Sequence, residues 1–297
     1  MTEPERTGLA LLPRQGETHV LALDLSDVTR RMWHGHVNDK RSEPERVAPS
    51  ALRHIAKLLR GRQPSHFLCA VEGFGSIRKN LFLAYKADRP EKPAGLLRCE
   101  AQIEDALRKA GAVLIRCAGL EADDVLAGAA MAAAQNRVPA VVATHDKDAE
   151  VLVSDQARVL IWRDDGKVLD EAAVLERWGV PAYRVSELLA IMGDSTDGVP
   201  GAKGLGKVAA AHILNAAVRE HISVLLRDGG TPWIPSAYRK KWLASREMIA
   251  MSWELTRLRG EEAARRIYFD DLETDALRVA ESLIDSAESQ LDDGGGR

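Results

Sequence analysis

Residues 112–148 read AVLIRCAGLEADDVLAGAAMAAAQNRVPAVVATHDKD. The runs Ala112–Cys117 and Pro139–Ala143 are short and apolar, which is typical of buried strands. Between them, Ala122–Gln135 has apolar residues at the spacing of a helix. A strand, a helix and a strand in this order are typical of one parallel unit of an α/β sheet.

The same alternation extends in both directions along the chain. We expect further strands at His19–Leu25, Ser65–Val71 and Arg158–Trp162, and further helices at Pro49–Leu59 and Leu96–Ala110. The strands are apolar almost throughout, which indicates burial on both faces. The sequence therefore predicts the α/β class, with a mostly parallel sheet flanked by helices.

From Pro181 onward the strand-like runs stop. The remaining patterns predict helices, and these lie at Val185–Ile191, Lys207–Ala217, His221–Leu226, Ser236–Leu258 and Asp275–Ser286. At the two ends of the chain, we expect a flexible tail over residues 1–17 and a disordered tail over residues 287–297.

The composition excludes several classes of protein. The chain has 297 residues and a net charge of −3, which argues against a protein that binds nucleic acid by overall charge alone. No apolar run approaches the roughly 20 residues of a membrane span, and the N-terminus lacks the apolar core of a signal peptide, so we expect a cytoplasmic protein. The three cysteines, Cys69, Cys99 and Cys117, are odd in number and far apart, so we expect buried core residues.

Acidic residues recur where the predicted strands end. Because the carboxyl ends of parallel strands meet at one edge of a sheet, these acids are expected to share a crevice there. They are Asp24, Glu72, Glu121, Asp123, Asp124, Asp146 and Asp148. Asp194 and Asp197 form a further i,i+3 pair beside a glycine-rich turn.

Each acid alone has an ordinary alternative interpretation, because acids often complement a helix dipole or begin a turn. Together they would repel one another unless a cation neutralised them. Carboxylates without a cluster of His or Cys favour Mg²⁺ or Mn²⁺. Two such ions in one cleft suit the hydrolysis of a phosphodiester.

Basic residues dominate the segment between Arg78 and Arg98, which begins close to Glu72. Tyr85 offers a ring on which a base could stack, and Lys86 adjoins it. The alternative is a solvated basic loop. A position over an acidic crevice favours contact with phosphate instead.

The segment Gly193–Lys207 reads GDSTDGVPGAKGLGK and joins two predicted helices. Gly204 and Gly206 allow the backbone to approach a phosphate, and Lys203 and Lys207 add positive charge. Glycine in a helix hairpin can also be purely steric. The ending does not match a Walker loop.

Taken together, these blocks resemble the 5′-nuclease family, which includes phage flap endonucleases and the N-terminal nuclease region of bacterial DNA polymerase I. Gly119–Ala127 is similar to the family's central acidic block and Thr144–Asp148 to its second block. Gly193–Gly206 is similar to its acidic pair and helix–three-turn–helix motif. The first motif corresponds to Asp24 with Arg31–His34, and the helical arch to Arg78, Tyr85, Lys86 and Arg89.

The resemblance, which covers roughly residues 18–260, implies a domain organisation. We expect a PIN-like nuclease domain at 18–180 that includes a helical arch at about 73–110. We expect a helical duplex-binding domain at 181–286, with the helix–three-turn–helix at about 186–217.

The resemblance also assigns roles to residues. It implies metal ligands, with one metal and its shell at Asp24, Glu72, Glu121, Asp123 and Asp124, and another at Asp146, Asp148, Asp194 and Asp197. It implies contacts to the scissile phosphate from Lys86, Arg78 and Arg31, and DNA binding by Tyr85, Arg89, Lys203, Gly204, Gly206 and Lys207. The implied cofactors are two or more Mg²⁺ or Mn²⁺ ions, with K⁺ at the helix–three-turn–helix.

Two positions depart from the family pattern. The family usually has Asp where this chain has Glu72, and a small residue where it has Leu25. Glu72 keeps an oxygen ligand but is longer by one methylene group.

The expected function is that of a stand-alone, metal-dependent 5′-nuclease, bacterial or phage-encoded. It would hydrolyse DNA at 5′ ends and flap junctions, where double- and single-stranded DNA meet, and RNA in RNA–DNA hybrids is compatible with this activity. We expect a monomer and no membrane partner. The alternatives are a PIN-type ribonuclease, a non-catalytic binder of DNA structures and a magnesium-dependent phosphatase for small molecules.

Overall fold

The computed structural model describes residues 11–38, 44–163, 166–218, 220–227 and 232–294. These residues contain a six-stranded sheet in the order β3-β2-β1-β4-β5-β6. The strands are β1 (Val20–Asp24), β2 (His66–Val71), β3 (Val113–Arg116), β4 (Ala140–Ala143), β5 (Val159–Trp162) and β6 (Val168–Leu169). The first five are parallel, and β6 pairs antiparallel with β5.

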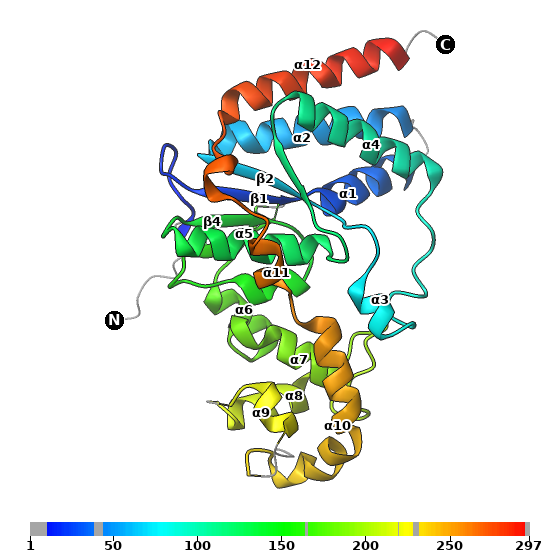
Figure 1. Cartoon of the computed structure of the whole chain (residues 1–297), viewed down its shortest axis with the longest axis vertical. Coiled ribbons are helices and arrows are strands. Elements are labelled where there is room, and N and C mark those ends of the chain that lie inside the picture. The colour runs from blue at the N-terminus through cyan, green and yellow to red at the C-terminus, as the bar shows by residue number, and fades with distance from the viewer. Residues whose placement is uncertain (1–10, 39–43, 164–165, 219, 228–231, 295–297) are drawn as a thin grey trace.

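Helices cover both faces of the sheet (Figure 1). One face carries α1 (Leu25–Asn38), α2 (Val47–Arg62), α4 (Ala94–Lys109) and α12 (Ala276–Gly294), and the other carries α5 (Ala122–Gln135). Strand β1 shows why, because Leu21 and Leu23 pack toward the first group while Val20 and Ala22 pack toward α5. The strands are buried on both sides, as their continuous apolar character predicted.

The apolar core between the sheet and α5 continues into the helical part of the molecule. This part contains α6 (Glu171–Trp178), α7 (Val185–Met192), α8 (Lys207–Ala216), α9 (Ile222–Arg227) and α10 (Ser236–Thr256). Short 3₁₀ helices lie at Pro44–Arg46, Asp148–Leu152, Ala182–Arg184 and Phe269–Leu272. The helical region predicted after Pro181 is confirmed.

A glycine turn joins α7 to α8 and contacts the segment before α4. Gly198 has a φ of +69°, and a Cβ built on it would lie 2.5 Å from the carbonyl oxygen of Ala84. Both the backbone conformation and the close approach require glycine here.

The five predicted strands are confirmed, but α1, α6 and β6 were not predicted. Helix α1 is amphipathic but rich in polar residues, and it begins immediately after Asp24 with no intervening turn. Apolar periodicity alone is too weak to identify such a helix.

The chain returns to the sheet after α10, which changes the predicted domain boundary. Helix α11 (Gly260–Ala264) packs against α5, and α12 packs against α2. Val279, Ala280 and Leu283 lie in the core of the first face. Residues 260–286 therefore belong with the sheet and not with a separate domain at 181–286.

Both predicted tails are shorter than expected. Helix α12 runs to Gly294, and Ala287 is fully buried within it, so the disordered tail predicted at 287–297 is wrong as far as Gly294. At the other end Leu12 is buried, and Glu17 pairs with Arg158 at 2.6 Å, so residues 11–17 are not a free tail. Residues 1–10 and 295–297 lie outside the described part.

The predicted arch is also shorter. Helix α3 (Ile77–Leu81) lies in the segment that follows β2, but α4 packs into the core through Leu96, Ile103 and Leu107. Residues 73–93, which we call the arch segment, are the part that stands away from the sheet (Figure 1).

Two further expectations concern burial and membranes. Cys69, Cys99 and Cys117 are buried free thiols, as predicted. In the described ranges, no helix is both long enough and apolar enough to cross a membrane.

Candidate active site

Asp24 ends β1 at the carboxyl edge of the sheet and is nearly buried, with 5% of its surface exposed. One carboxylate oxygen accepts a hydrogen bond from the Asp27 amide and the other from the Thr144 hydroxyl, each at 3.0 Å. Thr144 directly follows β4, the parallel neighbour of β1. Burial raises the pKa of Asp24 to about 6, and the nearby Asp27 and Asp146 also raise it.

The turn after β4 presents Asp146 and Asp148. The Asp146 amide donates to the Thr144 hydroxyl, and an Asp146 carboxylate oxygen accepts the Asp148 amide at 2.9 Å. Burial, followed by the charge of Asp146, raises the pKa of Asp148 to about 6. The pKa of Asp123 on α5 is raised well above its usual value, first by burial and then by Asp146 and Asp24. These side chains repel one another when ionised.

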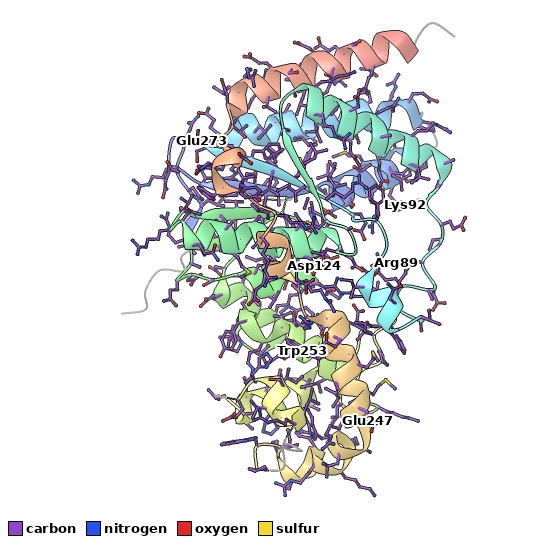
Figure 2. The ribbon with its side chains drawn as sticks, viewed as in Figure 1. Arg89, Lys92, Asp124, Glu247, Trp253 and Glu273 are labelled. Atoms are coloured by element: carbon purple, nitrogen blue, oxygen red, sulfur yellow. The ribbon has the colours of Figure 1, made fainter. Side chains whose placement is uncertain are left out.

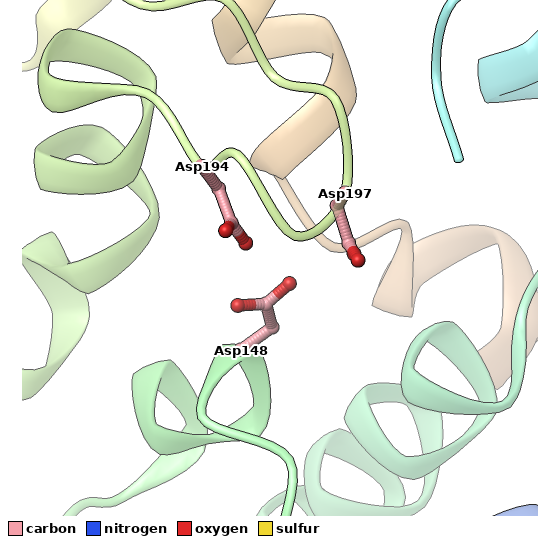
Figure 3. A group of neighbouring side chains, drawn as sticks. All are labelled: Asp148, Asp194 and Asp197. Carbon is pink, nitrogen blue, oxygen red and sulfur yellow. The ribbon is translucent and has the colours of Figure 1, made fainter. Parts of the chain in front are cut away.

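Among the described residues, three carboxylates form a close group that could hold a metal ion, which we call the acid trio (Figure 3): Asp148, Asp194 and Asp197. Each offers an oxygen, and these oxygens all lie within 4.8 Å of one another. Asp194 and Asp197 come from the loop after α7, whereas Asp148 begins a 3₁₀ helix after β4. The oxygen donors and their mutual distances fit a hard divalent cation.

Lysine side chains neutralise part of this charge. Lys147 Nζ lies 2.6 Å from an Asp194 oxygen and 3.0 Å from an Asp148 oxygen. Lys86 Nζ lies 2.6 Å from a Glu121 oxygen and 3.5 Å from an Asp197 oxygen. Lys86 therefore reaches from the arch segment into the acidic edge.

The backbone helps to hold Lys86 in place. Its φ is +52°, a left-handed conformation, and its amide donates to the Asp197 carbonyl at 2.9 Å. Arg89 pairs with the Asp197 carboxylate. Burial alone would raise the pKa of Asp197, but Lys86 and Arg89 outweigh it and hold that pKa below the usual value.

Glu72 directly follows β2, and Glu121 is the N-cap residue of α5. Glu72 is partly buried and accepts the Ala122 amide at 3.4 Å. Its pKa is raised first by burial and then by Glu121. Glu121 accepts hydrogen bonds from Tyr85 and Lys86, so it faces the arch segment.

The structure does not place Asp124 as a metal ligand or Arg78 as a phosphate contact. Their side chains form a buried two-pronged ion pair, with nitrogen–oxygen distances of 2.7 and 2.8 Å. Asp124 also accepts the amides of Glu121 and Arg259. Arg78 also donates to the carbonyl oxygens of Leu255 and Arg257 and is only 3% exposed. The pair ties the arch segment and α5 to the end of α10.

Tyr85 is not positioned to stack on a base. Its ring is buried with Val199 and Leu255, and its hydroxyl donates to Glu121 at 3.0 Å. Arg89 and Lys92, which follow Tyr85 in the sequence, lie on the loop between α3 and α4 (Figure 2). Asp124 lies near the start of α5 in the same view.

A cleft of about 380 Å³ opens at the acidic edge. Its lining comprises Asp24, Asp27, Arg30, Arg89, His145, Asp146, Lys147, Arg177, Thr196 and Asp197, and we call it the acidic cleft. Arg31, which was expected to contact phosphate, is not in this lining and pairs with Asp27 at 3.0 Å.

Sequence reasoning missed Asp27, Arg30 and Arg177 and gave His145 no role. His145 Nδ1 lies 3.0 Å from the Asp27 carboxylate. The i,i+3 pair Asp27 and Arg30 would have indicated one face of a helix, had α1 been recognised directly after Asp24.

The predicted duplex-binding residues lie on the turn before α8. Lys203, Gly204, Gly206 and Lys207 are all exposed. Gly204 has a φ of +77°, and its carbonyl accepts a hydrogen bond from Lys241 at 3.1 Å. Lys207 donates to the Arg177 carbonyl and lies over the Trp178 ring.

Comparison with known families gives one match over more than half of the chain. Residues 19–179 match the family model described as the 5′-3′ exonuclease, N-terminal resolvase-like domain. This range begins beside β1 and ends after α6, so it contains the whole sheet.

Several characterised relatives are similar in sequence. Flap endonuclease Xni of Pseudoalteromonas translucida is 26% identical over 245 residues, which cover 81% of this chain and 93% of that protein. A 5′-3′ exonuclease of Aquifex aeolicus is 30% identical over 164 residues, or 55% of this chain and 56% of that protein. The thermostable DNA polymerase I of Thermus aquaticus is 27% identical over 242 residues, but this match spans only 28% of the polymerase.

Solved structures support the fold. The zinc-bound 5′-exonuclease of phage T5 superposes with a TM-score of 0.65 at 18% identity, covering 91% of this chain and 99% of that one. The catalytic core of Rad2 in complex with DNA gives a TM-score of 0.51 at 17% identity, covering 91% and 93%. At these identities the likeness establishes a shared PIN-like arrangement of sheet and helices.

Proposed function

Because the chain belongs to the 5′-3′ exonuclease family of resolvase-like domains, we propose that it is a divalent-metal-dependent 5′-nuclease acting on DNA at 5′ ends and flap junctions. The proposal rests on one observation: carboxylates from three separate segments line the acidic cleft, and Lys86 reaches one of them, Asp197, from the arch segment. Relatives named as flap endonuclease and 5′-3′ exonuclease support the same activity.

The acidic side chains divide into two ligand sets in this proposal. The acid trio, with Asp146 beside it, would hold one Mg²⁺ or Mn²⁺ ion. Asp24, Asp123, Glu72 and Glu121 would hold another. When bound, such ions lower the pKa of a water and stabilise charge on phosphate oxygens. Asp124 is left out, because Arg78 and two backbone amides occupy its oxygens.

Lys86 and Arg89 supply the positive charge from the protein. Their contacts with Glu121 and Asp197 hold them at the cleft, where they would contact the scissile phosphate and stabilise the charge that develops on it. A fixed, partly buried ammonium group stabilises charge more than an exposed one, because little solvent has to reorganise around it.

The helical part would bind the duplex next to the cleft. Gly204 and Gly206 allow backbone amides at the start of α8 to approach a phosphate, and Lys203 and Lys207 add charge. The turn at Gly204–Lys207 would hold a K⁺ ion, which would add positive charge toward the phosphates of the duplex. Helices α7, α8, α9 and α10 would thus recognise the duplex by its shape. The arch segment would bind the single-stranded 5′ flap. The enzyme would act as a monomer.

The test is magnesium-dependent cleavage of a 5′-flap DNA by the parent protein and by Asp146→Asn and Asp148→Asn. Asparagine keeps an oxygen that can accept the backbone hydrogen bond of the turn, so both variants should fold. We expect each to lose cleavage by at least about 100-fold, because an ion ligand and its charge are removed. Asp105→Asn, an exposed substitution on α4, is the matched control.

Two outcomes would contradict the proposal. Cleavage by both variants at the parental rate would mean that the acid trio has no role in catalysis. Cleavage of matched RNA in preference to the DNA flap would favour the PIN-type ribonuclease.

A further inference from the structure

Arg30 lies on α1, one helical turn beyond Asp27, and lines the acidic cleft. Asp24, Asp27 and Asp146 line the same cleft. The arginine therefore lies among carboxylates that would surround the proposed metal ions.

Arg30 differs from the other arginines of the cleft lining. Arg89 pairs with Asp197, and Arg177 pairs with Glu150. For Arg30, the described residues provide no hydrogen bond or ion pair, and its Nε is buried without a partner. Arg31, the next residue along, turns to Asp27 instead.

A buried donor without a partner costs free energy, so its presence in a folded protein requires an explanation. Carboxylates are nearby, yet Arg30 does not pair with them. A guanidinium group presents several donors in a plane and matches a phosphate in two-pronged geometry. An anion that enters the cleft would satisfy the donor, and phosphate is the anion that this cleft is proposed to receive.

We propose that Arg30 binds a phosphate of the DNA strand inside the acidic cleft. This inference rests on the proposed nuclease function and adds a substrate contact to it. Arg30 takes the position that the family resemblance had given to Arg31.

The experiment compares Arg30→Gln with the parent protein on a set of 5′-flap substrates. In each substrate one phosphate near the cleavage position is replaced by an uncharged methylphosphonate. On the unmodified flap we expect Arg30→Gln to reduce kcat/KM by about 10- to 100-fold, because hydrogen bonds to charged groups are among the stronger ones.

Non-additivity identifies the contact. At one phosphate position the methylphosphonate should slow the parent protein and Arg30→Gln should suffer no further loss, because the two changes remove the same interaction. At the other positions the two effects should add. Arg53→Gln, on the exposed side of α2, is the matched control and should match the parent throughout.

Two results would overturn the inference. One is a parental rate for Arg30→Gln. The other is a loss that adds fully to every methylphosphonate, which would mean that Arg30 serves only to balance the charge of these carboxylates. Arg30→Lys keeps the charge and provides a second variant if the glutamine protein is unstable. Failure of the parent protein to cut any flap would refute the proposed function itself and is thus distinguishable.

Discussion

At the scale of single residues, the partner of an acid determines its role. Asp123 and Asp124 are adjacent and opened the same predicted helix. Asp124 is fully buried against Arg78, whose ion pair holds the pKa of Asp124 below its usual value against the effect of burial. The pKa of Asp123 is raised, because burial and other acids dominate around it. Of the two, only Asp123 has the electrostatic environment of an ion ligand.

We therefore predict that Arg78→Gln acts on stability. Removing one partner of a buried pair leaves an uncompensated charge, and we expect a loss of about 3–5 kcal/mol in the free energy of unfolding. Urea titration followed by circular dichroism measures it, with Lys79→Gln on the exposed side of α3 as the control. An unchanged free energy of unfolding combined with slow cleavage would instead mean that Arg78 contacts the scissile phosphate.

These residues also show where prediction from sequence ends. The acidic positions were predictable because parallel strands deliver their ends to one edge. The partners of Arg78 were not, because Leu255 and Arg257 lie more than 170 residues away in sequence. Burial of Tyr85 depends on the same distant packing against Leu255.

At the scale of elements, the arch segment links the acidic edge of the sheet to the helical part of the molecule. Its chain passes so close to the turn at Gly198 that the Lys86 amide bonds to the Asp197 carbonyl. The segment that carries Lys86 and the loop that carries Asp194 and Asp197 are thus held against each other. The five parallel strands and most helices were predictable from apolar periodicity, whereas the polar helix α1 was not, and Arg30 was missed with it.

We predict that Lys86→Ala separates chemistry from binding. Cleavage of the 5′ flap should slow on the order of 100-fold, because a preorganised positive charge is lost from the phosphate. Duplex affinity, measured with Ca²⁺ in place of Mg²⁺, should change little, because we propose that the duplex contacts lie on the turn before α8. Lys109→Ala, exposed on α4, is the control. Equal losses in cleavage and affinity would make Lys86 a docking residue.

At the scale of the whole molecule, the folded protein concentrates acids that oppose its own stability. Asp24 and Asp148 have pKa values of about 6, above the usual value of 3.8. The folded state therefore binds more protons than the unfolded state between these values, and it loses stability as pH rises from 3.8 to about 6. Bound divalent ions would offset that loss of stability.

We predict a pH-dependent stabilisation by magnesium. The rise in Tm on adding Mg²⁺ should be large at about pH 8 and should shrink as pH falls through about 6, because protons then compete for Asp24 and Asp148. Differential scanning fluorimetry with and without Mg²⁺ measures it, with Na⁺ at equal ionic strength as the control. A rise in Tm that is the same at about pH 5 and about pH 8 would mean that the ions bind elsewhere.

We expect the carboxylates at this edge of the sheet to hold divalent ions. Anomalous diffraction from crystals soaked in Mn²⁺ would locate them. One peak should lie among Asp148, Asp194 and Asp197 and another beside Asp24 and Asp123, with Asp124 still bound to Arg78. Absence of peaks from the cleft at saturating Mn²⁺, with Lys147 and Lys86 remaining on their carboxylates, would contradict this expectation.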